Sequence, residues 1–141
     1  MSKSWENDWT TFVAKISERV QSGESAESIS SHFAGRSVTW IGRVAKIHLD
    51  SLAPRVSFSM PRLEVALGTF GSSTVGDLSI PVDERKSSHW KDVRQGFDVR
   101  FTATLGSGIS PFPAIEIMKL SSGRTILMLR LCDAFSNSTE A

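Results

Sequence analysis

Apolar residues near the start of the chain recur every three or four positions, the spacing of one face of a helix. The pattern covers Ser4–Gln21. Its apolar stripe consists of Trp5, Trp9, Phe12, Val13, Ile16 and Val20. Ser4 or Asn7 can cap the helix N-terminus and Gly23 can end it, because short polar side chains accept hydrogen bonds from free N–H groups and glycine adopts the left-handed turn that follows many helices.

A second, shorter helix is predicted directly after the first. Ser25 can cap it, and Glu27 lies in its first turn, where a negative charge is favourable. Ile29 and Phe33 lie about one turn apart, so they share the apolar side of this helix. Residues 1–34 are therefore predicted to form an N-terminal helical extension.

After the helices the hydrophobic period changes to that of β-strands. Ser37–Leu49 is rich in β-branched and aromatic residues, and Gly42 in its middle permits a bulge or sharp coiling. Apolar residues then alternate with serine in Arg55–Met60, which predicts a strand with one buried face. Pro61 is expected to end this second strand, since proline cannot donate to a β-ladder.

The middle of the chain gives a weaker pattern. Two apolar pieces within Leu63–Val82 are separated by the loop-like residues 68–77, and a third strand is expected somewhere in this region. Ser87–Gln95 is predicted to be a short helix that Gly96 ends.

Alternation is clearest in Phe97–Leu105, where every second residue is apolar, and this segment is predicted to be the fourth strand. A loop rich in glycine, serine and proline leads to a closing hairpin over Ala114–Leu120 and Thr125–Leu131. The sequence thus predicts a β-barrel domain over residues 35–134, followed by a polar tail at 135–141.

This order of elements resembles the OB fold. The segments VTWIGRVAKI, SSHWKDVRQG and FDVRFTATL are similar to the first strand, the inter-strand helix and the fourth strand of that fold. The resemblance is to bacterial tRNA-anticodon-binding-like OB domains. It implies a mainly β protein, built on a small barrel of five to six strands, that binds single-stranded DNA or RNA without catalysis.

Composition and charge agree with one globular domain that has a basic barrel. The chain has 141 residues, of which 40% are hydrophobic and 22% charged. Residues 35–132 contain thirteen basic and eight acidic side chains, a net charge of +5, whereas residues 1–34 and 133–141 each carry −2. This excess of positive charge on the barrel favours anionic partners.

The sequence contains no signature of catalysis or of metal binding. His32, His48 and His89 are far apart and lack ligand-spaced partners, and the GxxxxGK[ST], GxSxG and HExxH motifs do not occur. Cys132, the one cysteine, is expected to be a small buried residue in a reducing, cytoplasmic compartment. No leader and no apolar run of membrane-spanning length is visible. We therefore expect a protein that is not an enzyme and that uses no cofactor, metal or membrane.

Basic and aromatic side chains supply the candidate binding site, because OB modules stack bases on aromatic rings while cations follow the phosphates. Trp40, Phe58 and Phe101 lie on the apolar sides of their strands and are expected in the core. The candidates for nucleic-acid binding are Arg43, Lys46, Arg55, Arg62 and Arg100, together with Phe112 in the loop after the fourth strand.

A protein partner is the alternative. The N-terminal stripe can pack on the barrel, which is the expected arrangement, or it can form an exposed face for a homodimer or a larger protein. The residues of this alternative partner site are Trp5, Trp9, Phe12 and Ile16. If the stripe or a barrel edge is exposed, a protein-interaction or regulatory module becomes the leading hypothesis.

Overall fold

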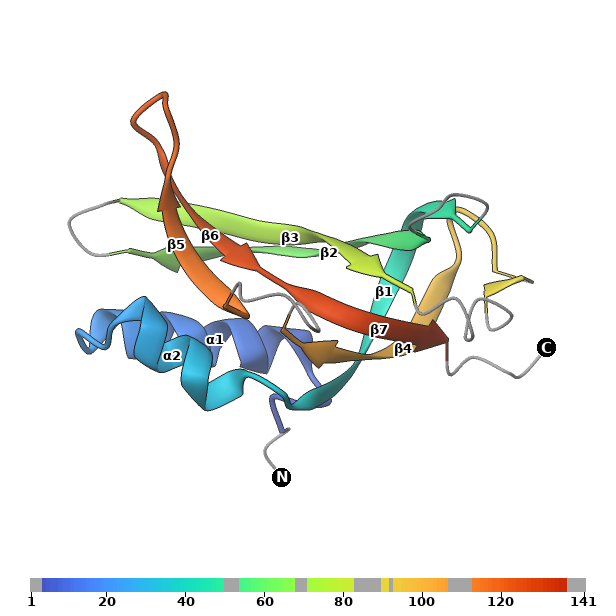
Figure 1. Cartoon of the computed structure of the whole chain (residues 1–141), viewed down its shortest axis with the longest axis horizontal. Coiled ribbons are helices and arrows are strands. Elements are labelled where there is room, and N and C mark those ends of the chain that lie inside the picture. Colours follow the sequence, from blue (N-terminus) through green and yellow to red (C-terminus); the bar gives the residue numbers. More distant parts are fainter. Residues whose placement is uncertain are drawn as a thin grey trace.

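Strands make up most of the structure, a computed structural model that describes residues 4–49, 54–67, 71–82, 90–91, 93–106 and 113–136. The prediction of a mainly β chain with an N-terminal helical extension is confirmed (Figure 1). The elements are α1 Trp9–Gln21, α2 Ala26–Phe33, β1 Ser37–His48, β2 Arg55–Ala66, β3 Ser72–Pro81, β4 Asp98–Leu105, β5 Ile115–Lys119, β6 Thr125–Leu129 and β7 Leu131–Ser136.

Five of the strands form one curled antiparallel sheet in the order β3-β2-β1-β4-β7. The curl brings the two edges of the sheet together, so that β7 lies against β3 and the sheet forms a half-barrel (Figure 1). Strands β5 and β6 follow β4 and precede β7 in the sequence, and they form a separate hairpin. Strand β6 also lies against β3. This arrangement agrees with the predicted OB-like barrel.

The helices begin and end for local reasons. Asp8, rather than Ser4 or Asn7, caps α1, and its carboxylate accepts a hydrogen bond of 3.0 Å from the backbone N–H of Thr11. Gly23, at a φ of +90°, follows the C-terminus of α1 as expected. The predicted cap of α2 is confirmed, because the hydroxyl of Ser25 accepts from the N–H of Ser28.

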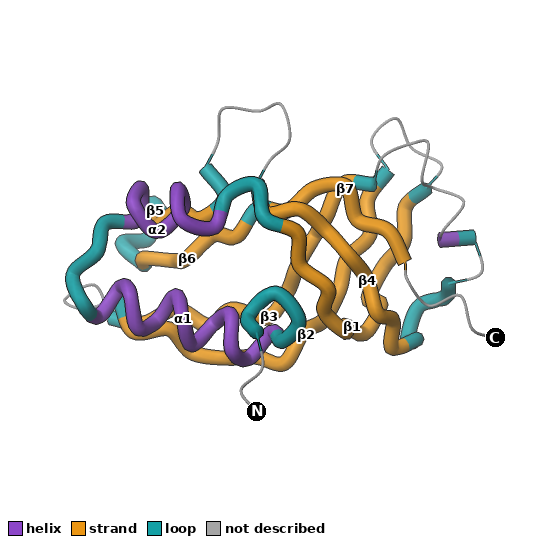
Figure 2. The backbone as a smooth tube through the Cα atoms, turned by 90° about the horizontal axis from the view of Figure 1, so that it is seen from below, coloured by secondary structure: helices purple, strands orange, loops and turns teal. Residues whose placement is uncertain are grey.

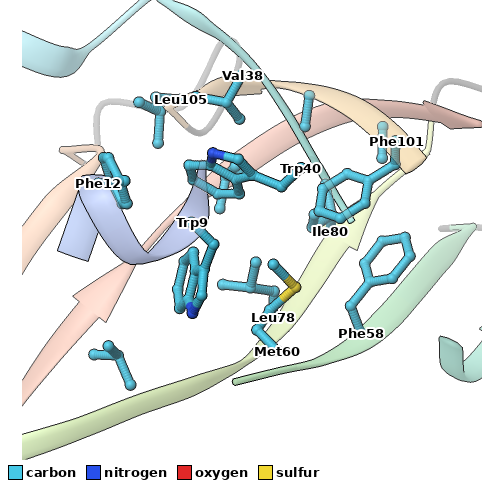
Figure 3. Close-up of a cluster of buried hydrophobic side chains, with 14 of the residues drawn as sticks. Trp9, Phe12, Val38, Trp40, Phe58, Met60, Leu78, Ile80, Phe101 and Leu105 are labelled. Atoms are coloured by element: carbon cyan, nitrogen blue, oxygen red, sulfur yellow. The ribbon is translucent and has the colours of Figure 1, made fainter. Parts of the chain in front are cut away.

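The apolar stripe of α1 is buried in the half-barrel. In Figure 3, Trp9 and Phe12 of α1 lie beside Trp40 of β1, and both rings contact the Trp40 ring. The Trp9 indole donates a hydrogen bond of 2.8 Å to the carbonyl of Pro61 on β2, and Phe12 and Ile16 have no exposed surface. Seen from below, α1 runs along β2 while α2 lies beside β5 (Figure 2). The helices and the barrel therefore share one core.

Residues before α1 attach the chain to the first strand. The backbone N–H of Thr39 donates to the carbonyl of Glu6, and the Trp40 indole donates to the carbonyl of Trp5. The hydrogen bond from Ser4 and then the guanidinium of Arg36 hold the pKa of the Glu6 carboxyl below its ordinary value. The residues before α1, like α1 itself, therefore hold the N-terminal part of the chain against the sheet.

The aromatic residues expected in the core are there. Phe58 and Phe101 stack with their ring centroids 4.0 Å apart, and Trp40 lies 4.9 Å from Phe12. Cys132 on β7 is also buried, as predicted. Trp90, from the predicted helix at Ser87–Gln95, is buried against Phe58, whereas four of the nine residues of that segment lie outside the described residues.

Strand β2 differs from its prediction, because it continues through Pro61 to Ala66. Between the pairs Ser59↔Asp77 and Leu63↔Val75, three residues of β2 stand opposite the single residue Gly76 of β3. Proline is tolerated at such a bulge because no ladder hydrogen bond is required of it there. Because of the bulge, β2 stays paired with β3 on both sides of Pro61, where the sequence predicted its end.

Other predicted boundaries also move. Residues 68–77 do not form one loop, since β3 begins at Ser72. The last predicted strand, Thr125–Leu131, divides at Arg130 into β6 and β7, and β7 enters the predicted polar tail as far as Ser136. The described residues therefore contain seven strands, of which five form the curled sheet and two form the separate hairpin.

The alternation in Phe97–Leu105 predicts that Phe97 lies on the same apolar side as Val99 and Phe101, and for Phe97 this prediction is wrong. Strand β4 begins one residue later, and the Phe97 side chain is 49% exposed. Gly96, at a φ of +93°, turns the chain immediately before it, and the Phe97 carbonyl accepts from the N–H of Val44 at the rim of the barrel. The turn therefore places this ring outside the core.

Replacing Phe12 with alanine should lower the free energy of unfolding by about 3–5 kcal/mol, because it opens a cavity in a fully buried aromatic cluster. The measurement is urea-induced unfolding followed by tryptophan fluorescence. Phe97→Ala removes the same atoms from a half-exposed site and should cost about 1 kcal/mol or less. Equal losses in the two variants would contradict the assignment of α1 to the core.

Candidate nucleic-acid interface

A groove follows the line along which β3 meets β6 and β7. The strands run side by side in the same direction (Figure 1), and among the described residues no backbone ladder joins β3 to either of them. One attachment is a hydrogen bond of 3.1 Å from the N–H of Leu127 to the hydroxyl of Ser73. Two hollows of about 290 and 480 Å³ lie over this line, which we call the seam groove.

The two hollows are parts of one surface feature, because Asp77, Met128 and Leu129 line both of them. On one side are residues of β2 and β3, and on the other are residues of β6, β7 and the turn before β6. The groove is thus built from segments that are about fifty residues apart in the sequence.

Four arginines line the seam groove in two pairs. Arg62 and Arg124 line the smaller hollow at one end, while Arg55 and Arg130 line the larger hollow at the other. Arginine presents a planar fork of donors that matches phosphate and carboxylate oxygens. The groove is therefore suited to anionic groups at both of its ends.

Hydrogen bonds orient the pair at the larger hollow. The guanidinium of Arg55 reaches from β2 across to β3, where it donates to the hydroxyl of Ser79 at 3.0 Å and to its carbonyl at 3.1 Å. Arg130 donates to the carboxylate of Glu116 at 2.7 Å and to the carbonyl of Pro113 at 3.1 Å. These contacts limit the freedom of both guanidinium groups before any ligand binds.

Arg62 reaches the smaller hollow because Gly76 has no side chain. A Cβ atom at Gly76 would lie 2.8 Å from Cγ of Arg62 and 3.3 Å from its Cα. The bulge in β2 thus lies directly over this glycine, and the guanidinium extends to within 3.7 Å of Asp77. The Arg62 side chain can therefore take this position only because residue 76 is a glycine.

The charge around the groove is positive but moderate. Four arginines and Asp77 line the groove, and Glu116 pairs with Arg130 beside it, which leaves a net charge of 4 − 2 = +2. Arg124 forms no ion pair with any of the described residues. Its position in the turn of the β5–β6 hairpin leaves its charge available to a ligand.

The structure divides the predicted basic residues into two groups. It brings Arg55 and Arg62 together in the seam groove. Arg43, Lys46 and Arg100 are exposed on β1 and β4, away from this groove, and Arg43 forms an ion pair of 3.2 Å with Asp98. The predicted aromatic contact, Phe112, lies outside the described residues.

Arg124 and Arg130 were missed by the sequence reasoning, which considered cations near the first, second and fourth strands. Both residues flank β6, in the predicted closing hairpin. They could have been found from the fold, because the third and last strands lie side by side and parallel when an OB-like barrel closes. This contact brings Arg124 and Arg130, at the two ends of β6, close to β3.

The groove surface is apolar between the arginines but contains no aromatic ring among its described lining residues. Trp40, Phe58 and Phe101 are buried and cannot stack on a ligand. Met128 and Leu129, both partly exposed, supply the apolar surface. The described lining of the groove therefore offers no ring on which a planar group could stack.

The N-terminal stripe does not provide a comparable surface. Trp9, Phe12 and Ile16 are buried, and Trp5 is half-buried against Phe33 with its ring under the guanidinium of Arg36. In the described part of the chain, no three His, Cys, Asp or Glu side chains are grouped to hold a metal ion. Neither described helix is long and apolar enough to cross a membrane.

Comparisons of the chain with protein-family models, curated proteins and solved structures found no match. The features that characterise the protein are therefore those of its own structure. They are a mainly β half-barrel of OB-like form, an N-terminal pair of helices that completes its core, and an arginine-lined groove at its seam.

Gly76→Ala should lower the free energy of unfolding by about 1–3 kcal/mol, because the new methyl group overlaps Arg62 and its backbone. Denaturant-induced unfolding measures this loss. Thr74→Ala, at an exposed position of the same strand, is the control and should cost less than about 1 kcal/mol. A Gly76→Ala variant as stable as the unaltered chain would show that Arg62 does not need the space above this glycine.

Proposed function

We propose that the protein binds single-stranded nucleic acid in the seam groove, without catalysis and without strong sequence preference. The observation that carries the proposal is the pairing of four arginines along one groove, two from β2 and two from the segments around β6. Guanidinium groups in this arrangement bind phosphates that follow one another along a strand.

The length of the groove suits a short stretch of nucleic acid. Its β3 side extends from Thr74 to Pro81, which is seven residue steps or about 23 Å at about 3.3 Å per residue. OB modules bind on the order of 4–16 nucleotides in comparable grooves. A strand that lies along β3 can therefore contact both arginine pairs at once.

The form of the groove favours a single strand over a duplex. Met128 and Leu129 are accessible between the arginine pairs and can contact the unstacked faces of bases, which a duplex keeps paired. Because phosphate contacts carry no sequence information, affinity from the arginines is expected to vary little with sequence. The lone buried Cys132 is in keeping with a cytoplasmic setting for this function.

Fluorescence anisotropy with a labelled single-stranded oligonucleotide tests the proposal. Affinity should fall steeply as salt rises, with a slope of about 0.7 on logarithmic axes for each phosphate contact. Replacing both Arg62 and Arg124 with glutamine should weaken binding by about tenfold or more and make the salt dependence shallower by about 1.4.

The matched control replaces Arg43 and Lys46 with glutamine. This variant loses the same two charges from exposed positions of β1 outside the groove, so its affinity should stay within about twofold of that of the unaltered chain. The proposed site is wrong if both double variants lose affinity equally. The proposed function is wrong if the unaltered chain does not bind at low salt.

A further inference from the structure

One carboxylate lies in the middle of the otherwise basic seam groove. Asp77 lines both hollows, whereas each arginine pair lines one of them. Its side chain is 72% exposed, and its distance of 3.7 Å from Nη2 of Arg62 is too long for a strong hydrogen bond. An exposed ion pair of this kind is weak, so the carboxylate oxygens can accept hydrogen bonds from a ligand.

The position of Asp77 restricts which part of a nucleic acid can lie beside it. A phosphate is repelled by a carboxylate, so phosphates are favoured at the two arginine pairs and disfavoured between them. The middle of the groove also has the apolar side chains of Met128 and Leu129. A nucleobase is the part of the strand that fits both an apolar surface and a hydrogen-bond acceptor.

A carboxylate distinguishes between pyrimidine bases because it only accepts hydrogen bonds. Cytosine carries an amino group at N4 that donates to carboxylates, whereas thymine carries a carbonyl oxygen, O4, at the same place. Two acceptors placed together repel each other, and the unpaired thymine oxygen would also lose its contact with water. Thymine and uracil also carry an N3–H donor where cytosine has an acceptor, so the selection requires that the carboxylate face the substituent at position 4 of the base.

We propose that Asp77 selects cytosine over thymine and uracil at the position between the two arginine pairs. This inference rests on the proposed function, since it requires a nucleic-acid strand in the seam groove. It adds a preference at one position to binding that is otherwise carried by phosphates. Asp77 would also lower the total affinity, because its charge opposes that of the arginines.

The test compares oligonucleotides of about ten nucleotides, made of deoxycytidine, thymidine or deoxyuridine, by fluorescence anisotropy at mildly alkaline pH, at which cytosine is neutral. The unaltered chain should bind the cytosine strand about two- to tenfold more tightly than either of the others, which corresponds to one net hydrogen bond. Deoxyuridine separates the effect of O4 from that of the thymine methyl group. In Asp77→Asn, the preference should disappear or fall below about twofold, while affinity for all three strands rises.

Asp98→Asn is the matched control. Asp98 is 62% exposed, pairs with Arg43, and lies in the same cross-strand row as Asp77 through the pairs Asp77↔Ser59, Ser59↔Arg43 and Arg43↔Asp98. Its replacement changes the charge of the chain by the same amount but lies outside the seam groove. This variant should keep the cytosine preference of the unaltered chain.

Equal binding of the three strands by the unaltered chain would overturn the role of Asp77 while leaving nucleic-acid binding intact. A preference that survives in Asp77→Asn, or that Asp98→Asn also removes, would overturn it as well. If no strand binds at low salt, the proposed function fails and the inference fails with it.

Discussion

The packing of the N-terminal aromatic stripe into the half-barrel is the interaction on which the other features depend. A five-stranded sheet that curls without a ladder between its edges leaves apolar residues to be covered, and α1 covers them with Trp9, Phe12 and Ile16. The indole of Trp9 also donates to the carbonyl of Pro61, which lies in the bulge of β2. The helix is thus a part of the core and an attachment point for the irregular strand beside the groove.

That irregular strand links the core to the surface. The bulge of β2 lies over Gly76 on its outer side and receives the Trp9 hydrogen bond through its backbone, so one local distortion connects the packing of α1 with the direction of Arg62. Bulges are common where a side chain must be directed away from the regular pleat. Here the same backbone change keeps β2 paired with β3 and directs a guanidinium toward the seam.

The seam itself follows from the way in which the barrel closes. Because, in the described part of the chain, β3 packs against β6 and β7 without a continuous backbone ladder, side chains make the closure and hollows lie over the line of contact. Arginines from both sides border these hollows, and Asp77 divides them into two basic ends. The incomplete closure of the barrel is therefore what creates a groove with a defined pattern of charge.

Features that depend on local periodicity could be predicted from the sequence. The helical spacing of the apolar stripe, the cap at Ser25, and the alternation in β1 and β4 are set by neighbouring residues, so the helices, these strands and the buried rings of Trp40, Phe58 and Phe101 could be predicted. These features require only that one face of each element be apolar. The choice of cap at Asp8 and the exact ends of strands were less accessible, since several polar residues can serve as caps.

The path of β2 through Pro61 and the composition of the seam groove depend on contacts between segments that are separate in the sequence. Pro61 is tolerated because it lies in a bulge opposite Gly76, where no ladder hydrogen bond is required of its nitrogen. Gly76 and Trp9, which binds the Pro61 carbonyl, both lie outside the local sequence of Pro61. Arg62 and Arg124 likewise come together through the parallel contact of β3 with β6, which no local pattern encodes. Periodicity determines which face of a strand is buried, but the neighbours of an edge strand are determined only when the whole sheet curls.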